Sequence, residues 1–170
     1  MPIKVNIRSD FLRTCGRAVY RHSEFGLAYD WSEASSDFNR KNLSQTIDQQ
    51  FGIASGNVFV TADTLTLVFS ERDGRFVSLD AYTNRERWET AIKTKPSNAE
   101  TGTLVLAQSV DDRISLDIVP AYSFNENEST LYISLGVQAS RYFDVGQDIV
   151  VGLANSTLVE VVLTNLRVEK

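Results

Sequence analysis

Residues 64–82, TLTLVFSERDGRFVSLDAY, constrain the fold more than any other stretch of this chain. Apolar and polar residues alternate in its first half, where Leu65, Leu67 and Phe69 are apolar, which is the period of a strand with one buried face. The alternation resumes at Phe76, after an interruption that contains Asp73-Gly74. Because glycine accepts the positive φ that tight turns require, the stretch predicts a β-hairpin.

The same alternation predicts further strands along the chain. A short opening strand is expected at residues 3–8 and another at residues 58–61. In the second half we expect three strand pairs, namely 103–107 with 113–119, 131–135 with 141–145, and 148–153 with 157–163. Strand pairs with turn signals about every 8–12 residues are typical of an antiparallel meander.

Two other segments predict short helices. From residue 39 a helix is expected through residue 50, ended by a following glycine. Asn84 resembles an N-cap for a helix at residues 85–93, which would bury Trp88.

The segment at residues 9–22 has two interpretations. Ser9 would cap a helix through His22, but Gly16 in its middle costs about 1 kcal/mol relative to alanine. A strand at residues 17–22 is the competing interpretation. The expected fold class is therefore α+β with β predominant, an antiparallel β meander (barrel-like or a strongly bent sheet) with two or three short helices.

The length of 170 residues suits one domain, 1–170, with one well-filled core. The alternative is a weak internal boundary near residues 94–102, the best linker candidate, which contain Pro96, Asn98 and Gly102. That composition fits a connection inside one domain equally well.

A short triplet recurs in the chain. Ser78-Leu79-Asp80 and Ser115-Leu116-Asp117 both fall in the expected second strand of a hairpin, and the last strand pair has Val159 and Val161 in the apolar places. Either a ββ unit has been duplicated, or the ordinary alternation of β-strands has produced the recurrence of the triplet.

The stretch SFNENESTLYISLGVQ…FDVGQDIVVGLANSTLVEVVLTNL, residues 123–166, resembles a group of small bacterial β-hairpin domains of unknown function. In that group an acidic turn precedes a Leu-Tyr-Ile-x-Leu strand, and an Asp/Gly turn leads to a hairpin that ends in aliphatic residues and Asn. The matching residues are Glu126, Glu128, Leu131, Tyr132, Ile133, Leu135, Asp144 and Asp148. Asn155-Ser156 stands where the group has Asp-Gly. The resemblance implies hairpins and no particular activity.

The net charge of −5 argues against a nucleic-acid partner, since phosphate binding requires concentrated Lys and Arg. Residues 1–41 hold seven Lys/Arg and five Asp/Glu, a net charge of +2, and the remaining residues hold ten and seventeen, a net charge of −7. An acidic body suits a basic partner, although the same charge also serves solubility.

Cys15 is the only cysteine and His22 the only histidine, which excludes an intrachain disulfide, a cysteine-based zinc site and sites that need two histidines. We expect both side chains on the apolar side of their segment, Cys15 partly buried. No nucleotide-binding fingerprint occurs, so no cofactor is expected. The chain lacks an apolar run of the length of a signal sequence or a membrane span, so we expect a cytoplasmic protein without a membrane partner.

Six residues are candidates for binding a ligand or partner. Arg13, Arg17 and Arg21 would form one basic stripe if their segment is helical, either a clamp for an anionic group or a solvated face. In a strand, residues four apart share a face but lie about 13 Å apart. Trp31, Tyr82 and Trp88 are the aromatic candidates.

No residue is assigned a catalytic role. Neighbouring carboxylates occur at Asp111-Asp112, Glu126 and Glu128, and Asp144 and Asp148, but these are expected in turns, where water makes the environments of two carboxylates alike. The leading functional hypothesis is a non-enzymatic protein-interaction module, specifically an immunity- or antitoxin-like inhibitor of a basic partner. The alternatives are a small-ligand-binding β-barrel with an aromatic-lined cavity and a self-associating structural module, so a homo-oligomer is also considered.

Overall fold

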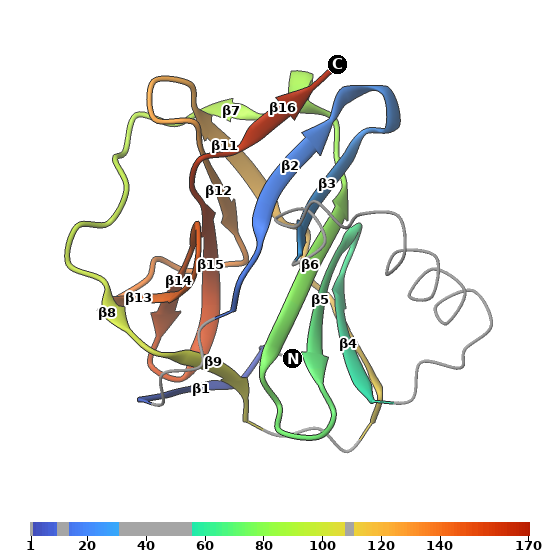
Figure 1. The fold of residues 1–170 in the computed structure, drawn as a ribbon, viewed down its shortest axis with the longest axis vertical. Coiled ribbons are helices and arrows are strands. Elements are labelled where there is room, and N and C mark those ends of the chain that lie inside the picture. The colour runs from blue at the N-terminus through green and yellow to red at the C-terminus, as the bar shows by residue number, and fades with distance from the viewer. Residues whose placement is uncertain (1, 10–13, 31–55, 108–110) are drawn as a thin grey trace.

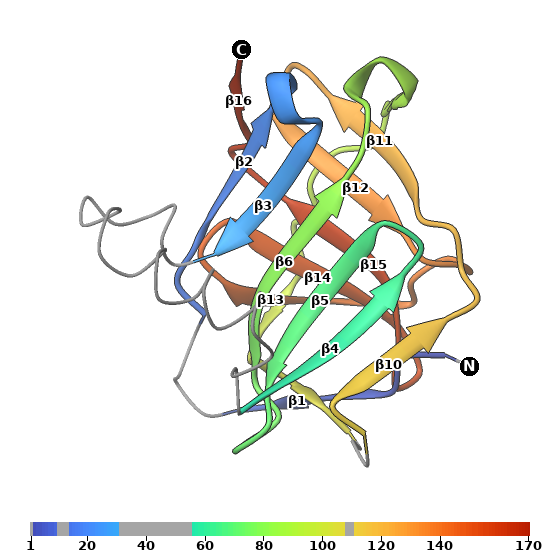
Figure 2. The ribbon, with the colours of Figure 1, turned by 90° about the vertical axis from the view of Figure 1, so that its right-hand side faces the viewer.

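Two seven-stranded sheets face one another in the computed structural model, which describes residues 2–9, 14–30, 56–107 and 111–170 (Figure 1, Figure 2). A third, two-stranded sheet pairs β1 (Val5–Arg8) with β9 (Thr103–Leu106). The opening strand is therefore confirmed. The helix expected at residues 39–50 lies outside the described residues.

The first sheet has the strand order β10 (Arg113–Leu116), β4 (Asn57–Ala62), β5 (Leu65–Ser70), β6 (Phe76–Tyr82), β3 (Gly26–Asp30), β2 (Arg17–Arg21), β16 (Arg167–Glu169). The order in the second sheet is β7 (Glu89–Thr90), β11 (Ala121–Asn125), β12 (Thr130–Ser134), β15 (Thr157–Leu163), β14 (Ile149–Ala154), β13 (Arg141–Gly146), β8 (Glu100–Thr101). In both sheets the five central strands pair antiparallel, and each edge strand pairs in parallel with its neighbour.

The two sheets have the same topology. The central order β4-β5-β6-β3-β2 becomes β13-β14-β15-β12-β11 when nine is added to each strand number. The strand that follows β6, β7, joins the second sheet, and the strand that follows β15, β16, joins the first (Figure 1). Each half of the chain thus supplies an edge strand to the sheet of the other half.

Local conformation supports this correspondence. The turn between β2 and β3 ends at Phe25 with φ 50°, and the turn between β11 and β12 ends at Ser129 with φ 48°. Phe25 N donates to His22 O at 3.3 Å, and Ser129 N donates to Glu126 O at 3.4 Å. The Ser-Leu-Asp triplets, by contrast, lie in β6 and β10, which do not correspond, so their recurrence reflects β patterning.

The hairpin at residues 64–82 is confirmed. β5 and β6 pair antiparallel, and Gly74 in the connecting turn has φ 70°. Leu65, Leu67 and Phe69 are buried, as the alternation predicts.

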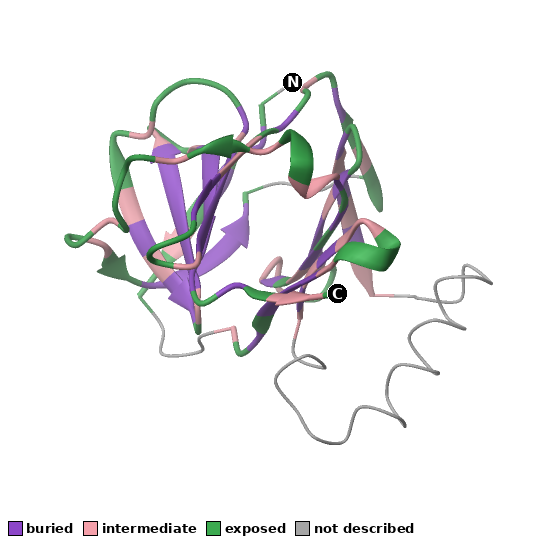
Figure 3. Cartoon of the chain, turned by 90° about the horizontal axis from the view of Figure 1, so that it is seen from above, coloured by how far each residue is buried: buried purple, intermediate pink, exposed green. Residues whose placement is uncertain are grey.

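One apolar core lies between the sheets and draws on both of them (Figure 3). Its largest fully buried side chains include Tyr20, Tyr29 and Phe69. The two tyrosine hydroxyls are paired inside it: Tyr29 Oη donates to Gln147 O at 2.5 Å, and Tyr20 Oη donates to Thr83 O at 3.2 Å. Both bonds satisfy polar atoms that burial would otherwise penalise.

The outer face of the second sheet is also partly buried. Tyr132, Val150 and Val162 form a second apolar cluster there, against which Ala91 and Ala99 pack. Lys93, between those alanines, forms an ion pair with the buried Glu160. Ala91, Lys93 and Ala99 of the connection between β7 and β8 therefore contact the outer face of the second sheet.

Polar contacts hold this connection in place. Tyr142 Oη donates to Glu160 Oε2 at 2.7 Å, so the buried carboxylate has two partners. Tyr132 Oη donates to Lys93 O at 3.1 Å, and Lys93 Nζ lies 4.4 Å from the centroid of the Tyr132 ring. The ammonium group thus has both an opposite charge and an aromatic face beside it.

The expected α+β class is wrong, because the described residues contain strands and two isolated 3₁₀ turns but no α-helix. Residues 17–21 form β2, the competing interpretation, since β3 and β16 supply it with hydrogen-bond partners on both sides. Of the helix expected at residues 85–93, only the 3₁₀ turn Arg85–Arg87 forms. Asn84 does cap it, with Oδ1 accepting from Glu86 N at 3.0 Å, but the chain then extends into β7.

The expected meander is also wrong. β9 pairs with β1 and β10 with β4, so residues 103–107 and 113–119 form no hairpin, and neither do β12 and β13. Only the last predicted pair, β14 with β15, is confirmed. Among the described strands neither large sheet closes into a barrel, since each order ends at two different edge strands.

We expect Gly74→Val to lower the free energy of unfolding by about 1–3 kcal/mol, because a β-branched residue is strained at φ 70°. A Cβ at this position would also lie 3.0 Å from Val105 Cγ1 and 3.2 Å from Leu106 O. Urea denaturation measures the change. Gly26→Val is the control, because its Cβ meets nothing closer than 3.8 Å, and equal losses in the two variants would contradict the assignment.

We expect Lys93→Met to destabilise the fold by about 1 kcal/mol or more, because the buried Glu160 carboxylate loses its countercharge. The double variant Lys93→Met/Glu160→Gln should recover most of the loss, since no charge then remains buried. Urea denaturation of the single and double variants gives the comparison. A double variant less stable than Lys93→Met would show that the ion pair is not the cause.

Candidate functional site

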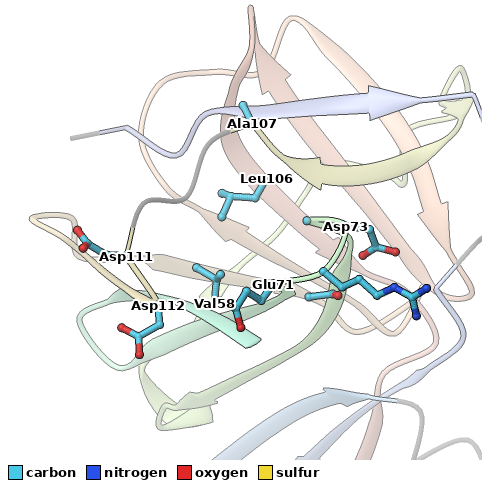
Figure 4. A pocket seen from close by; sticks show the side chains of 10 residues that line it. Val58, Glu71, Asp73, Leu106, Ala107, Asp111 and Asp112 are labelled. Atoms are coloured by element: carbon cyan, nitrogen blue, oxygen red, sulfur yellow. The ribbon is translucent and has the colours of Figure 1, made fainter. Parts of the chain in front are cut away.

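A hollow lined by several charged residues lies where the β5–β6 turn, the start of β4 and the end of β9 come together (Figure 4). We call it the acidic hollow. It has a volume of about 270 Å³ and is lined by Val58, Ser70, Glu71, Arg72, Asp73, Gly74, Leu106, Ala107, Asp111 and Asp112. Figure 4 shows Asp111 and Asp112 on one side, Asp73 on the other, and Val58 and Glu71 between them.

Three contacts between distant parts of the chain assemble this hollow. Leu106 N donates to Gly74 O at 2.8 Å, which fixes the end of β9 beside the turn. Phe59 N donates to Asp112 O at 2.8 Å, which fixes the aspartates beside the start of β4. Glu71 N donates to Gly56 O at 2.8 Å, which holds the base of the turn.

The carboxylates of the acidic hollow differ in their partners. Asp73 is held by Arg75, whose backbone N lies 3.2 Å from Oδ1 and whose Nε lies 2.5 Å from Oδ2. The side chains of Glu71 and Asp112 form no hydrogen bond or ion pair within the described part of the chain.

The pKa of Asp73 reflects this environment. Partial burial would raise the pKa of the carboxyl, but hydrogen bonds from the Arg75 backbone, the Ser70 hydroxyl and the Arg75 side chain outweigh it. The pKa therefore lies below its ordinary value, and Asp73 stays ionised at neutral pH.

The arrangement can hold a cationic side chain. Val58 and Leu106 are buried apolar residues that offer contact to an alkyl stem, and the carboxylates offer acceptors to an ammonium or guanidinium group. Among the described residues no group of three or more His, Cys, Asp or Glu side chains is placed to hold a metal ion.

A second hollow occupies the corresponding position in the other half. It has a volume of about 350 Å³ and lies between β1, the start of β13 and the β14–β15 turn. Its lining includes Arg141, which pairs with Glu100 at 2.6 Å, and the buried Phe143 and Leu153. The two hollows thus differ in charge although the surrounding strands correspond.

The predicted arginine stripe does not form a clamp in the described residues. Arg17 and Arg21 share one face of β2, four residues apart, and Arg21 pairs with Glu169 at 3.2 Å. Neither lines any of the hollows described here. Arg13 and Trp31 lie outside the described residues.

The remaining aromatic candidates lie at the end of β6 and directly before β7. Trp88 packs against Tyr20, with ring centroids 4.8 Å apart, and its Nε1 donates to Thr83 Oγ1 at 2.9 Å. It also borders an open hollow of about 360 Å³ together with Arg85 and Phe124. Tyr82 is 63% exposed on the outer face of β6, beside Phe25.

Trp88 also stacks on Tyr122, whose ring centroid lies 6.3 Å away. Burial raises the pKa of Tyr122 to about 12, against the opposing effect of the nearby Thr64 hydroxyl. The phenol is therefore neutral at physiological pH, and this aromatic group serves packing between the sheets.

Cys15 and His22 are both exposed, so the expectation that they lie on an apolar face is wrong. The reason is the strand: β2 buries Ala18, Val19 and Tyr20, and both residues lie outside it.

From the sequence, Asp111-Asp112 are expected only as solvated turn residues, without a connection to Glu71 and Asp73. Both pairs are acidic turns, which is the available signal. The two pairs lie close together because β10 pairs in parallel with β4, and no pattern in the sequence indicates that pairing.

Comparison of the chain with models of known protein families and with curated proteins found no match. The resemblance to β-hairpin domains at residues 123–166 therefore stays a prediction. In the part of the chain that the structure describes, no helix has the length and apolar character needed to cross a membrane.

We expect Asp73→Asn to lower the free energy of unfolding at pH 7 by about 0.5 kcal/mol, because the side chain is partly exposed and its pairing is screened. A pKa below its ordinary value means that the ionised Asp73 stabilises the folded state at neutral pH. The contribution is lost as the pH falls below the ordinary value of 3.8 and through the folded pKa, so the two proteins should converge there. Glu71→Gln is the control, and urea denaturation at several pH values should show it unchanged in stability.

Proposed function

We propose that this chain is a non-enzymatic protein-interaction module whose acidic hollow receives a basic side chain of a partner protein. The observation that carries the proposal is the pair of carboxylates on Glu71 and Asp112, which border a 270 Å³ hollow and have no partner among the described residues. A lysine or arginine side chain matches that volume and charge.

The charge of the chain supports a basic partner. Residues 42–170 carry a net charge of −7, which follows from ten Lys/Arg and seventeen Asp/Glu, and the acidic hollow belongs to this part. Complementary charge of this kind accelerates encounter and selects partners, and salt weakens it. The specific form that we propose is an inhibitor of the immunity or antitoxin type that covers a basic surface. A cytoplasmic location goes with it, because a single cysteine leaves no intrachain disulfide.

The alternative of a ligand-binding barrel has less support. That hypothesis required a closed sheet around an aromatic-lined cavity, whereas the described strands form open sheets and Tyr20, Trp88 and Tyr122 pack on one another. Self-association remains an outcome that the experiments below can detect.

The first test uses short capped peptides as probes and the backbone amide resonances of the protein as the readout. A tripeptide with a central arginine or lysine should shift the resonances of residues 71–75, 106–107 and 111–112, with a Kd in the millimolar range, because one exposed ion-pair site supplies little free energy (about 4 kcal/mol at 1 mM). The same tripeptide with methionine in the centre should leave them unchanged.

Charge-matched variants show whether the hollow itself is responsible. Glu71→Gln/Asp112→Asn should abolish the shifts, whereas Glu24→Gln/Glu86→Gln removes the same charge at exposed residues elsewhere and should retain them. Shifts scattered over the whole surface, or equal loss in both double variants, would reject the acidic hollow as the binding site.

A further inference from the structure

Among the described strands, β10 has a partner on one of its two edges. It is the outermost described strand of the first sheet, where it pairs with β4 in parallel (Figure 2). Phe59 N donates to Asp112 O, which sets the register of the ladder. Alternate residues of a strand direct their N–H and C=O groups to opposite sides, so Ile114 and Leu116 bond to β4.

Arg113 and Ser115 therefore direct their backbone groups away from the sheet. Both residues are exposed, and within the described residues no strand pairs with this side of β10. Two donors and two acceptors with the spacing of a β ladder are thus open to another chain. Of the four edge strands of the large sheets β10 is the longest, with four residues against two in β7, two in β8 and three in β16.

The residues that lead into this edge also line the acidic hollow. Asp111 and Asp112 immediately precede β10, and Asp117 follows it and is exposed. A segment laid along β10 would extend past these aspartates, and lysine or arginine side chains on it would meet opposite charge.

We propose that the partner binds as an extended basic segment that adds a strand to the free edge of β10 and places one basic side chain in the acidic hollow. The proposal rests on the function proposed above and specifies the partner: the main chain is bound by Arg113 and Ser115, and the side chain by the carboxylates. The protein already uses short strands in this way, since β7, β8 and β16 each add to a sheet edge.

Charge favours this occupant over a second copy of the chain. Antiparallel pairing of β10 with β10 of another copy would bring Asp111 and Asp112 of one copy toward Asp117 of the other. Like charges directly across a strand pair are destabilising. A basic segment meets the same carboxylates with attraction.

The test uses a short fluorescein-labelled peptide in which lysine and threonine alternate, and fluorescence anisotropy as the readout. One peptide is N-methylated at the lysines and another at the threonines. The lysine side chains must lie on the side of the peptide strand that faces the acidic hollow. In that orientation either the lysine N–H groups or the threonine N–H groups point to β10, but not both. One methylated peptide should bind about tenfold more weakly than the parent, and the other should bind like it. If the two methylated peptides bind the protein with equal affinity, whether that affinity equals the parent's or is lower, strand addition is wrong.

Variants of the protein give the second arm. Ser115→Pro removes an N–H that points away from β4, so it should weaken binding of the parent peptide by about tenfold while the sheet persists. Ser115→Ala is the matched control and should bind normally. Should Ser115→Pro fail to fold, as its circular dichroism would show, the methylated peptides decide the question on the wild-type chain.

The two proposals fail in different ways. The arginine tripeptide should still shift the resonances of the acidic hollow in Ser115→Pro, because it does not need the strand edge. If the tripeptide binds, but neither Ser115→Pro nor N-methylation weakens binding of the alternating peptide, strand addition is wrong and the acidic hollow remains the proposed binding site. If the tripeptide never binds the wild-type protein, the proposed function itself is wrong. Self-association that Ser115→Pro abolishes, with unchanged peptide binding, would assign the edge to a second copy and overturn the inference.

Discussion

Apolar contact between the inner faces of the two large sheets is the interaction on which this structure depends. The apolar core between the sheets takes residues from both of them, and neither sheet could remove its own inner face from water. Inside it the hydroxyls of Tyr20 and Tyr29 are paired, whereas the buried hydroxyl of Tyr122 has no hydrogen-bond partner among the described residues. With that contact fixed, the remaining polar backbone groups lie at the sheet edges and in the turns, and the hollows lie there too.

The edges are organised by pairing between segments far apart in the chain. Each described edge strand of the two large sheets joins its sheet in parallel, and a parallel neighbour cannot come from a tight hairpin. The acidic hollow is a product of this arrangement, because β9 and β10 approach the β5–β6 hairpin only through such long-range contacts. Its carboxylates belong to ordinary polar turns, and their location relative to one another makes them a site.

The sequence predicts what depends on local pattern. The β5–β6 hairpin follows from alternation and Asp73-Gly74, and the β14–β15 hairpin follows in the same way. Alternation says which face of a strand is buried but does not name the strand beside it, so the pairings of β10, β12 and β13 were wrong. The helix expected at residues 85–93 failed because the cap at Asn84 starts only one turn, after which the chain pairs with β11. Of the candidate site, the sequence predicted only that the acidic residues lie in turns. The arginine stripe was predicted for a helix, but residues 17–21 of that segment form β2.

The exchange of β7 and β16 between the halves has a consequence for how such a chain could arise. A polypeptide of half this length would contain one set of central strands but would place its last strand on the sheet of another molecule, which is the geometry of a domain-swapped dimer. In such a dimer the two hollows would be identical by symmetry. A single chain carries no such constraint, so one hollow can have carboxylates at Glu71 and Asp112 while its counterpart has Arg141.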